Sequence, residues 1–265
     1  MQLSVNGAAV LAATGGRDFD PERPVLVFVH GAGCDHTIWQ QQTRYFAHRG
    51  YAVLAPDLPA HGLSAGQALA SVPALAEWLV SLLDAAGVAR ATLIGHSLGA
   101  QASLEAAARY PERIAALALL GVAARTPVHP ELLGAAAAND HLSIDFFTAW
   151  GHGAHAHRGG NTAPGIWQIQ ATIRLQEEAA PGVLSCDFRA ADAYQDAVAS
   201  AKKVQCPTLF VLGAQDRMTP AKAADALVAA IAGSSRTVLA RTGHMMMLES
   251  PDALRMALKG FLHER

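Results

Sequence analysis

The sequence predicts an α/β fold with a mostly parallel central sheet of about eight strands, flanked by helices. Two observations support this prediction. Short apolar runs alternate along the 265 residues with longer segments of helical periodicity, which is the pattern of parallel strands joined by helices. The run Val25–Val29 is also apolar throughout, as expected of a strand that is buried on both faces.

The predicted strands follow in chain order. Two short strands open the chain and are joined at Asn6-Gly7, a pair favoured in tight hairpin turns. The third strand, Val25–Val29, is apolar and rich in β-branched residues. The remaining strands are predicted at Ala52–Ala55, Ala91–Gly95, Ala115–Gly121, Pro207–Gly213 and Arg236–Ala240.

Helices are predicted between these strands. Pro73, Pro220 and Pro251 stand near the starts of three of them, where the missing N–H of proline costs nothing. The predicted helices are Ile38–His48, Val72–Ala86, Leu98–Tyr110, Pro220–Ala232 and Asp252–His263.

One long segment, residues 124–205, interrupts the alternation because it contains no convincing buried strand. A structureless loop of about 80 residues would be unusual in a globular domain, so the segment is interpreted as a helical insertion over the sheet. We divide the chain into a core, residues 1–123 and 206–265, and a cap, residues 124–205. The helices predicted in the cap are Leu132–Ala138, Ile144–Trp150, Ile166–Glu178 and Ala190–Ala199.

The composition argues against several classes of protein. Charged residues make up 16% of the chain and the formal net charge is −2, so the basic excess of a nucleic-acid-binding protein is absent. No run approaches the ~20 apolar residues that a spanning helix needs, and the first residues do not resemble a secretory signal. We therefore expect a cytoplasmic globular protein without nucleic-acid or membrane partners, of open oligomeric state.

The three cysteines, Cys34, Cys186 and Cys206, cannot all pair with one another. None of them has the spacing of a metal-binding motif. We expect all three to be reduced, as is usual in the cytoplasm, and the sequence predicts neither a metal nor a cofactor.

The strongest local motif is Gly95-His96-Ser97-Leu98-Gly99, which follows an apolar run and precedes an alanine-rich helix. Gly-x-Ser-x-Gly in this strand–turn–helix context predicts a nucleophilic serine, since the sharp turn needs small residues on either side. The turn exposes the hydroxyl of Ser97 above the N-terminus of the next helix. That end carries free N–H groups and the positive end of the helix dipole, which suit a developing oxyanion.

A serine hydroxyl needs a base to remove its proton and an acid to orient that base. Asp216 follows the predicted strand Pro207–Gly213, and His244 follows the predicted strand Arg236–Ala240. Ser97, Asp216 and His244 are therefore the candidate catalytic residues, in the chain order Ser, Asp, His.

With these motifs the sequence resembles the α/β-hydrolase family over nearly its whole length. His30-Gly31-Ala32-Gly33 is similar to the oxyanion loop of that family, and the segment from Asp57 to Ser64 is similar to its D-x-P-x-H-G-x-S turn. Tyr110-Pro111-Glu112-Arg113 resembles the turn after the nucleophile helix. The resemblance implies an α/β-hydrolase fold whose cap is inserted after the sixth strand.

The resemblance also implies that the backbone N–H groups of Ala32 and Leu98 form the oxyanion hole, with Gly33 as a nearby alternative. The expected substrate pocket includes Gly33, Trp150, Trp167 and Met245; the two tryptophans could equally fill the interior of the cap.

Other polar residues have structural interpretations. Asp57, Asp187, Asp192 and Asp225 compete with Asp216 as the acid, but no carboxylate follows the sixth strand, where some relatives place it. Asp57, His30 and His61 are expected to stabilise turns, and His96 to pack rather than react. His152, His155 and His157 lie among glycines without a nearby carboxylate or cysteine, which favours a solvated or pocket-rim loop over a metal site.

Hydrolysis of a small carboxylic ester is the leading functional hypothesis, with no cofactor and a small-molecule ester as the only expected partner. The alternative enzyme hydrolyses an enol-lactone or a C–C bond in an aromatic ring-cleavage product. Such substrates carry carboxylates, for which Arg158, Arg174 and Arg189 are available. C–C hydrolases of this family usually have tryptophan after the catalytic histidine, where this chain has Met245. A catalytically idle, ligand-binding member of the fold is the alternative from another class.

Overall fold

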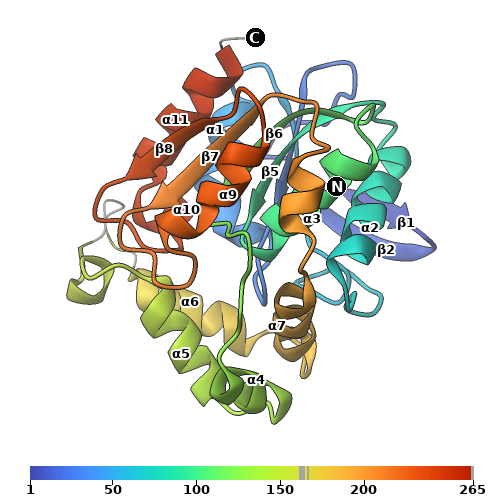
Figure 1. The fold of residues 1–265 in the computed structure, drawn as a ribbon. Coiled ribbons are helices and arrows are strands. Elements are labelled where there is room, and N and C mark those ends of the chain that lie inside the picture. The colour runs from blue at the N-terminus through green and yellow to red at the C-terminus, as the bar shows by residue number, and fades with distance from the viewer. Residues whose placement is uncertain (161–164, 166, 264–265) are drawn as a thin grey trace.

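An eight-stranded sheet forms the centre of the molecule in the computed structural model, which describes residues 1–160, 165 and 167–263 (Figure 1). The strand order is β1-β2-β4-β3-β5-β6-β7-β8. Only β1 and β2 run antiparallel to their neighbours, and all other pairs are parallel. The predicted fold class is thereby confirmed. The strands are β1 Gln2–Val5, β2 Ala8–Ala13, β3 Val25–Val29, β4 Ala52–Pro56, β5 Ala91–His96, β6 Ile114–Leu120, β7 Thr208–Gly213 and β8 Ser235–Leu239.

Local chemistry explains the first hairpin and the central strands. Asn6 and Gly7 both have positive φ, 51° and 82°, the combination that a type I′ turn between twisted strands requires. Every residue of β3 is buried, in keeping with a strand that has helices above and below it.

Two groups of helices flank the sheet, α2, α3 and α9 on one face and α1 and α11 on the other (Figure 1). Ser71 caps α2, since its hydroxyl accepts a hydrogen bond of 3.3 Å from the Ala74 N–H. None of the helices in the described ranges is long and apolar enough to cross a bilayer. The core elements are the short helix η1 His36–Trp39, α1 Gln40–Ala47, α2 Val72–Ala85, α3 Leu98–Arg109, η3 Ala221–Ala224, α9 Asp225–Ala230, α10 Met246–Glu249 and α11 Pro251–His263.

Between β6 and β7 the chain forms further helices, most of which lie together beyond one end of the sheet (Figure 1). No strand occurs among the residues described in this segment. Ile166, where one predicted helix begins, lies outside the described residues. The elements are α4 Pro130–Ala137, α5 Leu142–Gly151, η2 Ala156–Arg158, α6 Gln168–Glu177, α7 Val183–Ala193 and α8 Ala197–Ala201.

The helix predicted over Ala190–Ala199 is wrong. The structure ends α7 at Ala193 and begins α8 at Ala197, with an extended Tyr194 between them (φ −79°, ψ 101°). A buried acid explains the break: Glu105 of α3 accepts hydrogen bonds from the Tyr194 hydroxyl at 2.7 Å and from the Ser200 hydroxyl at 2.5 Å. Because both donors must reach one carboxylate, the chain turns between them. The helix α8 packs against α3 and α9, so the last part of the inserted segment belongs to the core packing.

The same carboxylate receives a third hydrogen bond, from Arg109 Nε at 2.5 Å. Burial of Glu105 acts to raise its pKa, but the hydrogen bonds from Ser200, Tyr194 and Arg109 hold the pKa below its usual value. Glu105 is 5% exposed and is therefore an ionised anchor between α3 and the end of the inserted segment.

We expect Glu105→Ala to lower the free energy of unfolding by about 2–4 kcal/mol, because two buried hydroxyl groups lose their acceptor. Urea unfolding followed by circular dichroism measures the change. Glu77→Ala is the matched control, since exposed Glu77 also pairs with Arg109 but should contribute less than about 1 kcal/mol. Equal losses in the two variants would contradict the anchor.

Candidate active site

Ser97 occupies a strained turn between β5 and α3. Its φ of 53° and ψ of −117° lie in a region that residues with a side chain rarely adopt. Its N–H donates to the Leu120 carbonyl at 2.9 Å, which fixes the turn to the end of β6. A Cβ at Gly95 would overlap the Gly99 carbonyl, and a Cβ at Gly99 would overlap backbone carbonyls at the end of β3. Both glycines of the motif are therefore required by close backbone approach.

Asp216 and His244 meet beyond the ends of β7 and β8. The Nδ1–H of His244 donates to Asp216 Oδ2 at 2.7 Å, and the two residues are 1% and 6% exposed respectively. The Thr219 N–H and hydroxyl each donate to the same carboxylate at 2.8 Å. Burial acts to raise the pKa of Asp216, but the charge and hydrogen bond of His244 and those from Thr219 hold it below the ordinary value. Asp216 is therefore held ionised against the imidazole.

The second nitrogen of His244 is free to act as a base. Because Nδ1 carries the proton given to Asp216, Nε2 is the acceptor in the neutral ring. This nitrogen is buried and has no hydrogen-bond partner in the described parts of the chain. The imidazole lies against Gly121, one residue after the carbonyl that holds Ser97. The end of β6 therefore brings the predicted base and the predicted nucleophile into the same small region.

His96 packs against His244, the candidate base, and binds its backbone. Its Nε2–H donates to the His244 carbonyl at 3.0 Å, and the two ring centroids are 4.6 Å apart. Burial, together with the nearby His244, holds the pKa of His96 well below its usual value, so the ring is neutral. His96 thus packs and donates one hydrogen bond, in line with the structural role expected of it.

The loop Gly31–Gly33 lies directly against the nucleophile, since a Cβ at Gly31 would be 3.1 Å from Ser97 Cβ. Ala32 is buried and its carbonyl accepts from Gln176 Nε2 at 3.3 Å. Its N–H donates to no residue in the described ranges. Leu98 is the first residue of α3, so its N–H is one of the four that a helix leaves unpaired. Among the described residues, neither of the two predicted oxyanion donors therefore has a hydrogen-bond partner for its N–H group.

The N–H of Gly33, by contrast, is occupied. It donates to Asp187 Oδ2 at 2.8 Å, and this carboxylate comes from α7 of the cap. Gly33 therefore supplies no free donor beside Ala32.

The sequence model described as "Alpha/beta hydrolase family" matches residues 26–257. The chain belongs to this family. It is 30% identical over 257 residues to RutD of Klebsiella pneumoniae (strain 342), which is named as a candidate carbamate hydrolase; the match covers 90% of this chain and 91% of that protein. It is also 28% identical to Protein ABHD8 of Bos taurus, of which it spans only 56%.

Two solved structures show the same fold. The enol-lactonase from Burkholderia xenovorans LB400 superimposes with a TM-score of 0.89 at 23% identity, covering 99% of this chain and 100% of that one. A thermophilic esterase superimposes with a TM-score of 0.82 at 28% identity, covering 100% of this chain and 97% of that one. The eight-stranded sheet is thus that of an alpha/beta hydrolase.

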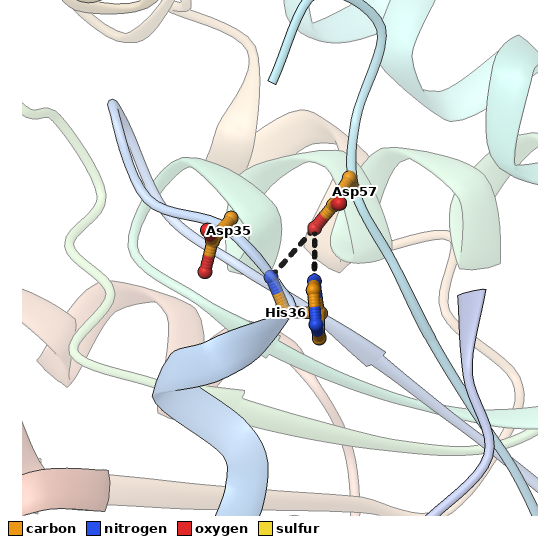
Figure 2. A group of neighbouring side chains, drawn as sticks. All are labelled: Asp35, His36 and Asp57. Carbon is orange, nitrogen blue, oxygen red and sulfur yellow. Dashed lines mark hydrogen bonds and ion pairs between the residues drawn. The ribbon is translucent and has the colours of Figure 1, made fainter. Parts of the chain in front are cut away.

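In this family member the turn Asp57–Ser64 has the structural role predicted for it. Figure 2 shows Asp57 Oδ1 accepting hydrogen bonds from both the backbone N–H of His36, at 2.8 Å, and its Nδ1, at 2.7 Å. The other oxygen, Oδ2, accepts from the Leu63 N–H at 2.9 Å. His30 also binds this region, because its Nε2 accepts from the Leu58 N–H at 3.0 Å.

Metal ions are bound by clusters of His, Cys, Asp or Glu side chains. Among the described residues one such cluster has its donor atoms close enough together, within 4.8 Å of one another: Asp35, His36 and Asp57. Asp35 Oδ1 already accepts hydrogen bonds from the N–H and hydroxyl of Thr37. Since Asp57 is bound as described above, the hydrogen bonds favour a structural cluster (Figure 2).

The cap contributes a buried histidine beside the site. His152 is 2% exposed, with Nδ1 donating to the Thr148 carbonyl at 3.1 Å and Nε2 lying 3.2 Å from the Thr172 hydroxyl. His152 is therefore not solvated, whereas His155 and His157 are exposed, and both His152 and His157 line a pocket, as the pocket-rim alternative expects. One residue before His152, the Gly151 carbonyl accepts hydrogen bonds from the backbone N–H groups of His244 and Met245, both at 2.9 Å. This cap segment therefore holds the loop that carries the candidate base.

The predicted pocket residues are dispersed. Met245 is fully buried, while Trp167 is 58% exposed on the surface. Trp150 is half-buried, with its ring 5.8 Å from the Arg217 guanidinium. A cavity of about 400 Å³ does adjoin the oxyanion loop, and Ser97 and His244 are not among its lining residues. Its lining residues are Gly33, Cys34, Asp35, His36, Thr37, His61, Gly62, Leu63, Leu175, Glu178 and Ala179.

Three residues at the site are missing from the sequence-based candidates as functional groups. Thr219 holds the acid, Gln176 holds the Ala32 carbonyl and Asp187 holds the Gly33 N–H. Thr219 follows Asp216 by three residues. Its contact with Asp216 could have been identified from the sequence, because aspartate side chains commonly accept hydrogen bonds from residues a few positions further along the same turn. The two cap residues have no such local signal, because their partners lie 144 and 154 residues away.

We expect the hydrolase to lose stability as the pH falls from about 6.5 to about 4. Burial lowers the pKa of His30 and of His152 from 6.5 to about 4. The unfolded chain therefore binds protons in this range that the folded chain cannot bind, which favours unfolding by a few kcal/mol. Melting temperatures measured from pH 7 to pH 4.5 follow the effect.

The variant His152→Gln should lose less melting temperature over this range than the wild type. His155→Gln, which changes an exposed histidine of the same cap segment, should behave as the wild type does. An unchanged pH dependence in His152→Gln would contradict the assignment of His152 as a buried neutral ring.

Proposed function

We propose that this protein is a serine hydrolase that cleaves small carboxylic esters, with Ser97 as nucleophile, His244 as base and Asp216 as acid. The observation that carries the proposal is the 2.7 Å hydrogen bond from His244 Nδ1 to Asp216, which leaves the unpartnered Nε2 near the strained turn of Ser97. A base that is held in one tautomer and is free on its reactive side is what activation of a hydroxyl requires.

The reaction follows from these positions. His244 Nε2 takes the proton of the Ser97 hydroxyl as Oγ forms a bond to the ester carbonyl carbon, and the carbonyl π electrons move to its oxygen. The N–H groups of Ala32 and Leu98 donate to this oxyanion, each worth on the order of 3 kcal/mol. When the C–O bond to the alcohol breaks, His244 returns the proton to the leaving oxygen. Water, deprotonated by His244, then releases the acid and restores Ser97.

The choice of an ester rests on chemistry and on one comparison. Esters are the substrates that a Ser-His-Asp site with two backbone donors attacks most readily, since alkoxide is a better leaving group than amide nitrogen. The 28% identical solved structure is described as a thermophilic esterase and covers the whole of this chain.

The arginines weigh against a ring-cleavage acid as substrate. Arg158, Arg174 and Arg189 are all exposed, and Arg174 pairs with Glu177 at 2.6 Å. A carboxylate recognised inside the site would need a buried cation. The intact Asp216–His244 pair likewise weighs against a catalytically idle binding protein.

A carbamate is the second candidate substrate, because RutD is 30% identical over nearly its full length. A carbamate presents the same carbonyl to Ser97 with nitrogen on its acyl side. Initial rates on a p-nitrophenyl ester and on the matched p-nitrophenyl carbamate compare the two candidates directly, and faster turnover of the carbamate would replace the ester as the proposed substrate.

We expect Ser97→Ala to lower kcat on p-nitrophenyl esters by at least about 10⁴-fold, because the covalent step is lost. Initial rates from acetyl to dodecanoyl esters measure the loss and the preferred acyl length. Ser81→Ala on α2 is the control, since among the described residues the Ser81 hydroxyl binds only the Glu77 carbonyl. Esterase activity of wild-type magnitude in a folded Ser97→Ala protein would refute the assignment.

Asp216→Asn should lower kcat by about 10⁴-fold, since an amide cannot hold the imidazole in the required tautomer or stabilise its charge. Asp225→Asn serves as the comparison, because Asp225 forms an exposed ion pair with Arg236 at 2.7 Å. Retention of half the wild-type rate by Asp216→Asn would mean that another carboxylate orients His244.

A further inference from the structure

A carboxylate from the cap is buried against the oxyanion loop. Asp187 of α7 is 1% exposed, and its Oδ2 accepts hydrogen bonds from the Gly33 N–H and from His61 Nε2, both at 2.8 Å. The contact joins the cap to two separate core segments, the oxyanion loop and the turn after β4. Neither the triad nor the oxyanion donors include Asp187.

The hydrogen bonds of the loop show what Asp187 controls. The Gly31 carbonyl accepts from the Cys34 N–H at 3.2 Å, and the Ala32 carbonyl is held by Gln176 of the cap. Gly33, with a φ of +61°, turns the chain and gives its N–H to Asp187. The Ala32 N–H is the proposed oxyanion donor. Cap side chains thus hold the two backbone groups that follow it in the chain, the Ala32 carbonyl and the Gly33 N–H.

The loop also has little room to move. A Cβ at Gly33 would lie 2.8 Å from Leu184 Cδ1 and would overlap the Gln176 amide. Both of these residues belong to the cap, on α7 and α6. The loop that carries the Ala32 N–H is therefore confined by cap residues, and its start is fixed by β3, which it follows in the chain.

A buried anion this close to a developing oxyanion would oppose catalysis unless a cation neutralised it. His61 supplies that cation. Its Nδ1 lies 3.0 Å from the Pro59 carbonyl and its Nε2 lies 2.8 Å from the Asp187 carboxylate. Both partners are acceptors, so both ring nitrogens must carry protons, which only the imidazolium does. The His61–Asp187 pair is then neutral as a whole.

The groups around His61 are consistent with this charge. Asp57 contributes a second negative charge nearby, and although burial acts to lower the pKa of His61, Asp187 and its hydrogen bond raise it above the ordinary value. The neighbouring His30 ring, 5.0 Å away, is neutral because burial and His61 lower its pKa to about 4. Burial raises the pKa of the Cys34 thiol, so it adds no charge.

We propose that Asp187 is a positioning residue of this hydrolase: from the cap it fixes the oxyanion loop through the Gly33 N–H, with His61 as its counter-ion. The proposal rests on the serine-hydrolase function proposed above. It implies that the oxyanion hole is complete only while α7 is seated on the core.

The test measures the rate at which a fluorophosphonate modifies Ser97, followed by intact-mass spectrometry. In this reaction Ser97 Oγ bonds to phosphorus, fluoride leaves and His244 takes the proton, while the phosphoryl oxygen occupies the oxyanion hole. Asp187→Asn and Asp187→Ala should slow the modification about tenfold or more. On a p-nitrophenyl ester that the wild type hydrolyses, kcat should fall by the same factor with KM within threefold.

Asp192→Asn is the matched control, because Asp192 lies on the same helix and accepts the Val128 N–H at 2.9 Å, away from the loop. It should react within twofold of the wild type. Melting curves establish that each variant is folded. Should Asp187→Ala prove unfolded, Asp187→Asn, which keeps the size and shape of the side chain, decides the matter.

The pH profile separates positioning from a merely structural role. In the wild type the modification rate should fall as the pH rises past the raised pKa of His61, because the imidazolium then loses its proton and leaves Asp187 as an unneutralised anion. The alkaline fall should be absent in Asp187→Asn. A wild-type rate and profile in folded Asp187→Asn would overturn the positioning role alone, whereas a wild type whose Ser97 does not react would overturn the proposed function as well.

Discussion

The hydrogen bond between Asp216 and His244 fixes the orientation of the imidazole on which the rest of the candidate site depends. It selects one tautomer of the imidazole and so determines which nitrogen can accept a proton. Keeping it requires support from several elements: Thr219 donates to the acid, Gly151 of the cap accepts the His244 N–H, and His96 donates to the His244 carbonyl. The proposed catalytic histidine is thereby held by β5, the loop after β7 and the cap together.

Four histidines of the site region occupy three different protonation states, and their hydrogen-bond partners determine each state. His30 gives its Nδ1–H to the Gly31 carbonyl and accepts at Nε2, so it is neutral. His96 is neutral with the proton on Nε2, whereas His61 faces two acceptors and is cationic. His244 carries its proton on Nδ1. His30 therefore fills space and binds its own turn, His96 donates a hydrogen bond, and His61 is a counter-ion. His244 is the proposed base, and in each case the surrounding groups determine the role.

Much of this arrangement could be predicted from the sequence because its signals are local. The Ser97 motif, the turn Asn6-Gly7 and the apolar strands each depend on neighbouring residues, so pattern alone indicates them. The break in the helix at Tyr194 could not be predicted in this way, since it depends on Glu105, 89 residues earlier. From the sequence, Asp187 is no more than one of the aspartates that compete with Asp216 as the catalytic acid, because nothing near it in the sequence indicates that it reaches Gly33. Contacts between the cap and the core depend on how the two pack together, and the hydrophobic periodicity of the sequence carries no information about that packing.

The cap of this chain supplies the carbonyl of Gly151 to the catalytic loop and the carboxylate of Asp187 to the oxyanion loop. Such a cap is not an interchangeable module. A chimaera that grafts a cap from another family member onto this core would need to bring a carboxylate to the same place on its last long helix. Without one, the graft would leave the imidazolium of His61 buried in the core without its counter-ion. The need for this ion pair between cap and core therefore limits which caps natural or laboratory recombination can exchange.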